Sequence, residues 1–214
     1  TTQWHENGQK QKEGNFKDGY PDGKTTDWHE NGHKYYEENF KDGYPDGNTT
    51  SWYENGQKKL EVNFKYGKKD GKQTMWYENG QIHQQGYFKY GDFDSKWTVW
   101  YENGNLRNVE NWISNKENGK WTYWDESGQK ERELIYKDGA EISSIWHGYY
   151  ENGQLKHKTN YKGGKKNGKS TIWYENGQKQ MQGNAKDGKQ YGKWFVWDKN
   201  GQKVEVIFKD GKCI

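Results

Sequence analysis

Aromatic and turn-forming residues recur along this chain at a fixed spacing. The segment from Trp52 to Gln81 begins and ends with the same six residues, Trp-Tyr-Glu-Asn-Gly-Gln. The Asn of this motif, replaced once by Ser, falls near positions 7, 31, 55, 79, 103, 127, 152, 176 and 200. The steps are 24 residues, except for one of 25 between positions 127 and 152. Nine units of one period therefore fill residues 1–214 as a single repeat array.

Two aromatic columns flank the Asn of each unit. Three positions before it lie Trp4, Trp28, Trp52, Trp76, Trp100, Trp124, Tyr149, Trp173 and Trp197. Nine positions after it lie Phe16, Phe40, Phe64, Phe88, Trp112, Tyr136, Tyr161 and Ala185, whereas the last unit is one residue short and places Phe208 at eight. The runs between the Gly, Asp, Asn and Pro clusters are too short for helices and predict two strands per unit.

Each Glu-Asn-Gly predicts a hairpin turn, because Gly adopts the left-handed conformation and Asn tolerates the neighbouring position. Hairpins joined by short turns give an antiparallel meander. We therefore predict an all-β fold, an elongated, twisted, single-layer antiparallel β-meander made of nine β-hairpin repeats of ~24 residues.

The length of the Glu-Asn-Gly loop decides which side chains share a face of the sheet. A three-residue loop pairs Trp52 with Lys58, whereas a two-residue Asn-Gly loop pairs Trp52 with Lys59. We favour the three-residue loop because it is expected to gather apolar groups on the face of the Trp column. The residues that it would bring there are Leu60, Val62 and Phe64.

The segment YYENGQLKHKTNYKGGKKNGKS, residues 149–170, carries the features that the units share: an aromatic residue, Glu-Asn-Gly-Gln, an aromatic-Lys-x-Gly turn and Asp/Asn-Gly-Lys. It resembles the MORN repeat, in the variant found in bacterial YwqK-like antitoxin proteins. The resemblance implies a twisted single sheet of hairpins that serves protein contacts, with immunity or antitoxin partners among its members and no catalytic motif. Departures from the pattern are Ser127, Ser95 and the irregular segment at residues 138–148.

The second face of the sheet changes character along the chain. Residues six, four and two positions before the Asn share this face. They are polar in early units, as in Thr25, Asp27 and His29, and aromatic in later ones. Because Trp and Tyr anchor interfaces, we predict partner binding by these aromatics; the alternative is that curling of the sheet buries them within the chain. The predicted partner-binding residues are Trp97, Tyr101, Trp121, Tyr123, Trp146, Tyr150 and Trp194.

Composition narrows the classes of function. Aromatic residues make up 17% of the chain and the formal net charge is only +3, which argues against disorder. The sequence has only two arginines, Arg107 and Arg132, so nucleic-acid binding is disfavoured. Cys213 is the single cysteine, which excludes a disulfide scaffold. No apolar run reaches transmembrane length.

Candidate chemistry yields neither a catalytic nor a metal site. His5 and His29 occupy a column that is Tyr in later units, and the other histidines share no metal-ligand spacing. Glu recurs at the first turn position of eight units, which indicates a repeated structural role rather than an acid–base pair. We therefore predict a non-enzymatic protein without cofactors.

These features predict an interaction scaffold that binds another protein, or a second copy of itself, through aromatic columns. An antitoxin or immunity role rests on the family resemblance. The alternatives are a structural subunit of an extracellular fibre or surface assembly, joined end to end by its open sheet edges, and a carbohydrate-binding surface. The sequence begins within a repeat, as a processed or truncated chain would, and it leaves two compartments open: the bacterial cytoplasm or, after removal of a signal peptide, the cell surface.

Overall fold

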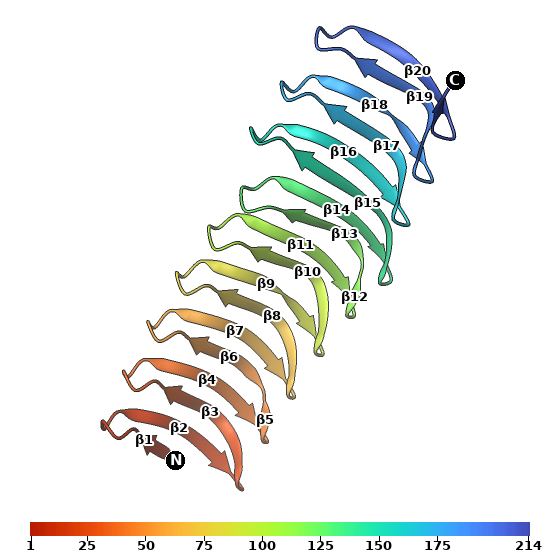
Figure 1. The fold of residues 1–214 in the computed structure, drawn as a ribbon. Helices are drawn as coiled ribbons and strands as arrows, with labels where there is room; N and C mark the ends of the chain where they lie inside the picture. The colour runs from red at the N-terminus through yellow and green to blue at the C-terminus, as the bar shows by residue number, and fades with distance from the viewer. The chain divides into compact units, whose positions relative to one another are not determined.

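The computed structural model describes all residues 1–214 and contains strands and turns but no helix (Figure 1). The strands form one open antiparallel sheet of 21 strands, in which neighbours along the chain pair with each other. The all-β antiparallel meander predicted from the sequence is therefore confirmed. The chain divides into two compact units, Thr1–Lys116 and Glu117–Ile214, which are described separately.

The first unit is made of hairpins whose long strands hold eight or nine residues, apart from one strand of six residues. Its strands are β1 (Thr2–Trp4), β2 (Lys10–Lys17), β3 (Tyr20–Trp28), β4 (Lys34–Lys41), β5 (Tyr44–Pro45), β6 (Gly47–Trp52), β7 (Lys58–Lys65), β8 (Lys68–Trp76), β9 (Ile82–Lys89), β10 (Asp92–Trp100) and β11 (Leu106–Ile113). The two-residue strand β12 (Lys116–Glu117) lies at the boundary.

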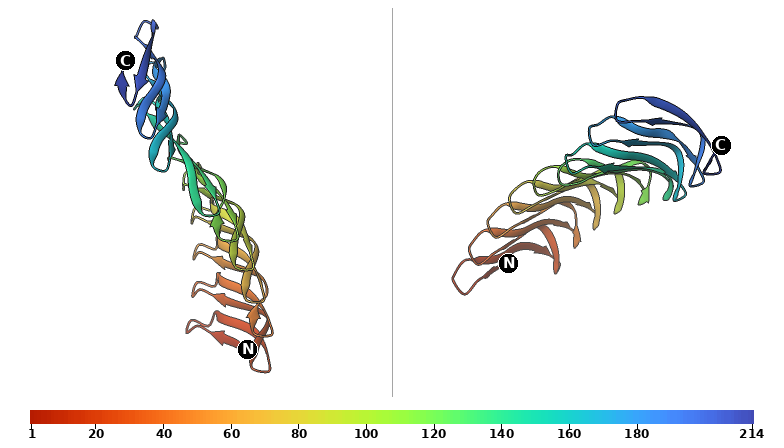
Figure 2. Two further views of the ribbon diagram at one scale, coloured as in Figure 1. Left: turned by 90° about the vertical axis from the view of Figure 1, so that its right-hand side faces the viewer. Right: turned by 45° about the horizontal axis from the view of Figure 1, so that its top comes forward.

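The second unit repeats the same design. Its strands are β13 (Gly119–Trp124), β14 (Lys130–Lys137), β15 (Ala140–Tyr149), β16 (Leu155–Lys162), β17 (Lys165–Trp173), β18 (Lys179–Lys186), β19 (Lys189–Trp197), β20 (Lys203–Lys209) and β21 (Lys212–Cys213). Within each unit the long strands bend along their length, as Figure 2 shows from two sides.

The Glu-Asn-Gly turns are three-residue hairpin loops, as predicted. Tyr53 N–H donates to the carbonyl of Gln57, and Gly56 N–H donates to the carbonyl of Tyr53, both at 2.9 Å. Gly56 has a φ of +85°, a left-handed conformation that glycine adopts without strain. Trp52 pairs with Lys58, which confirms the predicted closing pair.

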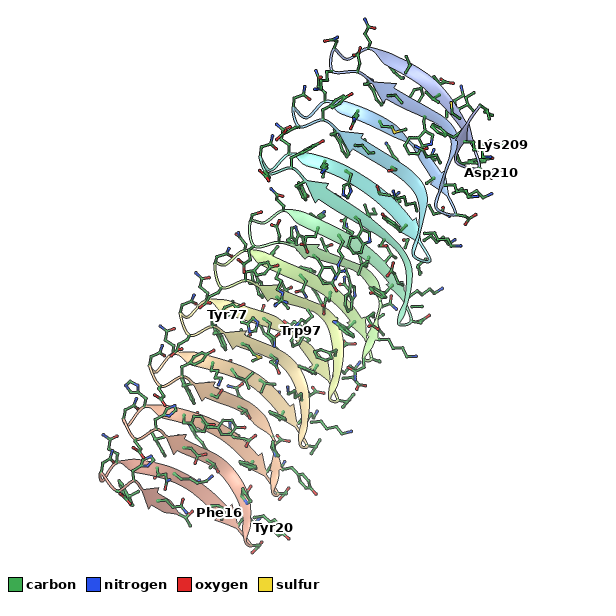
Figure 3. All side chains as sticks on the ribbon, viewed as in Figure 1. Phe16, Tyr20, Tyr77, Trp97, Lys209 and Asp210 are labelled. Atoms are coloured by element: carbon green, nitrogen blue, oxygen red, sulfur yellow. The ribbon has the colours of Figure 1, made fainter.

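The opposite ends of the hairpins are closed by two-residue turns. Lys17 pairs with Tyr20 across Asp18 and Gly19, which have φ values of +50° and +83°. Two consecutive positive φ values define the mirror-image turn that matches the twist of antiparallel strands. Figure 3 shows Phe16 and Tyr20 beside this turn, and Lys209 and Asp210 at the corresponding turn after β20.

A bulge beside the column residue of every unit but the last overturns the face predicted for Leu60, Val62 and Phe64. Beyond the pair of Trp52 with Lys58, the register shifts by one residue, so Ser51 pairs with Leu60. Paired residues share a face and neighbours along a strand do not. The apolar residues Leu60, Val62 and Phe64 therefore lie on the face opposite Trp52, against the expectation from the sequence.

The sheet has two distinct faces. The Trp-column face carries the column from Trp4 to Trp197. The opposite side is the core face, which carries cross-strand pairs such as Thr49 with Val62 and Trp97 with Glu110. Val62 is only 1% exposed, and a cluster of Phe88, Trp97 and Val99 is buried on the core face. The core therefore consists of side chains packed over one sheet layer.

The last unit lacks this bulge. Trp197 pairs with Lys203 and Val196 with Val204, without a shift, and Gly192 still pairs with Phe208 as Gly47 pairs with Phe64. The residue that the last unit lacks is thus the bulge residue of the other units. This one-residue gap was the sequence signal from which the bulge could have been inferred.

Candidate functional site

The Trp-column face is a ladder of rings covered by lysines. A lysine three positions after the Asn reaches the Trp ring of the next unit: the ammonium of Lys34 lies 5.4 Å from the ring centre of Trp52, and that of Lys58 lies 5.7 Å from Trp76. The same contact joins Lys179 to Trp197 at 5.7 Å. Cation–π contacts and burial of the lysine stems make this column part of the structure.

Hydroxyl groups two positions before the Asn connect adjacent units. Tyr53 Oη donates to the carbonyl of Trp76 at 2.7 Å, and Tyr174 Oη donates to that of Trp197 at 2.9 Å. His5 Nε2 lies 3.0 Å from the carbonyl of Trp28 and replaces the tyrosine hydroxyl. This contact explains His5 in the tyrosine column, whereas Nε2 of His29 is buried without a hydrogen bond.

The Asn of each turn forms a second ladder. Asn31 Nδ2 donates to the carbonyl of Glu54 in the next turn at 3.0 Å, while its Oδ1 accepts the N–H of His33 at 2.9 Å. Asn55 and Asn79 reach Glu78 and Glu102 in the same way. In this ladder each glutamate contributes its main-chain carbonyl, which accepts the hydrogen bond from the Asn side chain.

The structure places the seven predicted partner-binding aromatics in different surroundings. Trp97, Trp121 and Trp194 are buried, at 6%, 6% and 3% exposed, whereas Trp146 is 41% exposed. The three tyrosines in the set are half-buried: Tyr101, Tyr123 and Tyr150. The alternative that the chain buries its own rings therefore holds for three tryptophans, and the partner-binding role of the seven remains a prediction.

Glycines on adjacent strands make room for the buried rings. A Cβ added to Gly86 would lie 1.8 Å from Trp97, and one added to Gly183 would lie 2.2 Å from Trp194. Each indole therefore lies directly on a neighbouring backbone. Sequence reasoning missed both glycines, although each lies seven positions after the Asn of the unit that precedes its Trp.

Trp146 is exposed because the strand register slips there. In regular pairings the residue six before the Asn faces the residue seven after the preceding Asn, as Gln73 faces Val62. Between β14 and β15, however, Leu134 faces Ser144, and Trp146 faces Arg132. The slip lies in the unit that contains the extra residue of the 25-residue step.

A hollow of about 460 Å³ accompanies this slip on the core face of the second unit. Its walls are Glu141, Ser144, Trp146, Tyr161 and the turn glycines Gly163 and Gly164. The rings of Trp146 and Tyr161 meet edge to face with centres 6.5 Å apart. Arg132 stands 5.3 Å from the centre of Trp146 and 4.4 Å from that of Tyr123, so Trp146 is held in place.

A strong electrostatic effect acts on a carboxylate of the Trp-column face in the second unit. Burial alone would raise the pKa of the Glu133 carboxyl, but hydrogen bonds and charges from Lys120 and Lys130 outweigh it and lower the pKa to about 2. Lys130 Nζ lies 3.0 Å from the carboxylate, and Lys120 also pairs with it. Lys24 and Lys34 lower the pKa of Glu37 against the same burial effect in the first unit. These carboxylates are already paired within the chain.

Histidines do not gather into a reactive group. Burial, with nearby positive charge, lowers the pKa of His83, His147 and His157. No three His, Cys, Asp or Glu side chains are placed to hold a metal ion, and no helix could cross a membrane. Cys213 is exposed and unpaired.

Comparison with known proteins assigns the repeat. The family model described as the MORN repeat variant matches residues 1–18, 21–42, 45–66, 69–90, 93–113, 117–138, 145–162 and 166–187. A search of curated proteins finds no significant match. Among solved structures, the chain is similar to the one titled "Crystal Structure of TcdB2-TccC3-TEV", at 11% sequence identity and a TM-score of 0.24. That alignment covers 97% of this chain but only 13% of the other.

Each matched segment spans the strand before a Glu-Asn-Gly or Glu-Ser-Gly turn, the turn itself and the strand after it. Together they cover more than half of the sequence. The chain therefore belongs to the MORN repeat variant family.

Proposed function

We propose that this chain is a non-enzymatic protein-binding scaffold whose docking point is the exposed Trp146. The observation that carries the proposal is the contrast within the core face. Trp97, Trp121 and Trp194 are buried there, while Trp146 is 41% exposed beside a hollow of about 460 Å³. A fixed, exposed indole next to a concavity is a typical anchor of protein interfaces.

The polar groups around Trp146 define the side chain that fits. Glu141 forms no ion pair, and it lines the hollow with the hydroxyl-bearing Ser144 and Tyr161. A partner's basic or hydroxyl side chain that enters this hollow would interact with the carboxylate of Glu141 and pack against the rings of Trp146 and Tyr161. The occupant that we propose is thus an interface loop of another protein with such a residue at its tip.

A more specific role as an antitoxin or immunity protein is part of the proposal and rests on the resemblance to YwqK-like proteins. Under this reading the occupant is a loop of a toxin. The sequence offers no catalytic pair for a competing enzymatic role, because its recurrent glutamates hold equivalent turn positions.

A second candidate is a structural subunit that assembles by its sheet edges. β1 pairs only with β2, and the end strand β20 pairs with β19 and, over two residue pairs, with β21. Open strand edges accept further strands. Mass in solution across concentration separates the two candidates: growth of mass with concentration favours assembly, and a constant monomer mass favours the scaffold.

The docking proposal is tested with the double variant Trp146→Ala and Tyr161→Ala. A partner captured by crosslinking from cells that produce the chain is purified, and its affinity is measured by calorimetry. We expect the double variant to bind at least tenfold more weakly, because truncation of an interface hot spot costs about 2 kcal/mol or more. The control is Tyr191→Ala, which removes a ring that is 52% exposed in the same unit.

Equal affinity of the double variant and the wild type would overturn this docking point. Binding of a glycan array by the wild type, lost in the double variant, would instead assign the hollow to a carbohydrate.

A further inference from the structure

The Trp-column face of the second unit contains a second hollow, which differs from its counterpart in the first unit. It has a volume of about 350 Å³ and lies over β15 to β18. Lys158, Lys169 and Lys179 surround it, with Trp173, Asn160 and Gln182. It faces away from the Trp146 docking point, because Lys158 and Lys169 lie on the strand faces opposite to Tyr161 and Ser170.

An equivalent hollow lies over the first two repeats, and each of its seven lining residues has a counterpart in the second hollow. Lys24, Trp28 and Lys34 stand where Lys169, Trp173 and Lys179 stand in the second unit, at the same distances from the Asn of their unit. The two remaining charged positions differ: the first hollow has Glu13 and Glu37. The second has Lys158 and Gln182 at these positions.

With Lys158 and Gln182 in place of the two glutamates, the second hollow has no carboxylate in its lining. In the first hollow Glu37 lies 2.7 Å from both Lys24 and Lys34, so its lysines are neutralised within the chain. In the second hollow no lysine forms an ion pair, and residues 152–174 contain six lysines without a single Asp or Glu. Three ammonium groups around one concavity attract an anion from solution.

A further polar group in the second hollow lacks a partner. Gln182, which replaces the neutralising glutamate, has its Oε1 buried without a hydrogen bond. Rotation of this amide presents either its carbonyl or its NH₂ to a ligand. Thr171 and Asn160 add polar side chains at the wall, and Trp173 supplies an aromatic surface.

From this arrangement we propose that the hollow formed by Lys158, Lys169 and Lys179 binds a phosphate or sulfate group. Such an oxyanion carries enough negative charge to engage three lysines, and its oxygens accept hydrogen bonds from their ammonium groups. Because an organic group can pack against the ring of Trp173, we expect an ester of the oxyanion to bind more tightly than the free ion. This site is independent of the function proposed for Trp146.

The test uses a variant that restores the arrangement of the first hollow. Lys158→Glu with Gln182→Glu gives the second hollow the residues that the first one already contains, so the fold is expected to persist with an unchanged or higher melting temperature. Binding of inorganic phosphate, inorganic sulfate and phenyl phosphate is measured by calorimetry at low and high salt. We expect the wild type to bind phosphate and the double variant to bind it at least tenfold more weakly.

The converse variant supplies the matched control. Glu13→Lys with Glu37→Gln creates three unpaired lysines in the first hollow and is expected to add a second phosphate site per chain. Tighter binding of phenyl phosphate than of inorganic phosphate identifies an ester as the ligand, whereas equal binding identifies the free ion. Equal phosphate affinity in the wild type and the Lys158→Glu, Gln182→Glu variant, or no binding by the wild type, would overturn the proposal.

Discussion

At the scale of single residues, the absence of a side chain is as important as the presence of a ring. Gly86 and Gly183 leave the backbone bare where the indoles of Trp97 and Trp194 lie on it. Because the sheet has a single layer, such contacts supply the burial that a second layer provides in other proteins. Small and large residues on adjacent strands are thus complementary.

Replacing Gly86 by Ala is expected to destabilise the fold by about 2–3 kcal/mol, because the new methyl group would overlap the Trp97 ring. The measurement is the free energy of unfolding from urea titration. Gly14→Ala is the control at the equivalent position, where the new Cβ would meet the hydroxyl of Thr25 at 2.9 Å. A change below about 1 kcal/mol is expected for the control, and equal effects of both substitutions would contradict the packing of Trp97 on Gly86.

Glu133 makes stability depend on pH. Because its pKa is lowered to about 2 in the folded chain, its ion pairs stabilise the fold above the unfolded pKa near 4.5 and lose this effect as the pH falls toward 2. Glu133→Gln should therefore cost about 1–3 kcal/mol at pH 7 and almost nothing near pH 2. Unfolding measured from pH 7 to pH 2 tests this.

Glu61→Gln is the control for the pH experiment, since the Glu61 side chain is 37% exposed and pairs with one lysine only. Its loss should cost below about 1 kcal/mol at any pH. A cost of Glu133→Gln that stays constant over the whole range would show that the ion pairs are not its source.

At the scale of the structural element, each hairpin is defined by its two turns and joined to the next by side chains. Asn and Tyr provide these connections, because each donates to a main-chain carbonyl of the following unit. The ladders of hydrogen bonds explain why Asn and Tyr recur at the same positions of the units. Each unit needs the same residues because it satisfies the same carbonyl groups.

Tyr53→Phe should destabilise the fold by about 1 kcal/mol, because it removes the hydrogen bond to the carbonyl of Trp76 while the ring remains. Thermal unfolding measures the effect. Tyr66→Phe removes a hydroxyl from a ring that is 72% exposed and should be neutral. A neutral Tyr53→Phe would mean that the hydroxyl ladder contributes no stability.

At the scale of the whole molecule, the sequence was sufficient to predict the strands, their meander order and the three-residue turns. Periodic Gly and Asn residues determine these features locally. The face of Leu60 and Val62 was predicted wrongly, because one extra residue opposite Trp52 reverses it, and a hydrophobic pattern alone does not reveal a bulge.

The candidate sites were harder to predict from the sequence. The exposure of Trp146 depends on a slip of two residues between strands, and the hollow at Lys158 becomes apparent only by comparison with the equivalent hollow at Glu13. Equivalent positions of the repeat therefore differ in burial and charge. The difference in burial follows from pairing with neighbouring strands, which the sequence of one unit does not contain.

The division of side chains between the two faces supports every other conclusion, and nuclear Overhauser effects measure it directly. With methyl labelling of Val and Thr, the account predicts strong contacts between the methyl groups of Val62 and that of Thr49, which pair across β6 and β7. Contacts of Val62 with the methyl group of Thr50 or the indole of Trp52 in their place would contradict it.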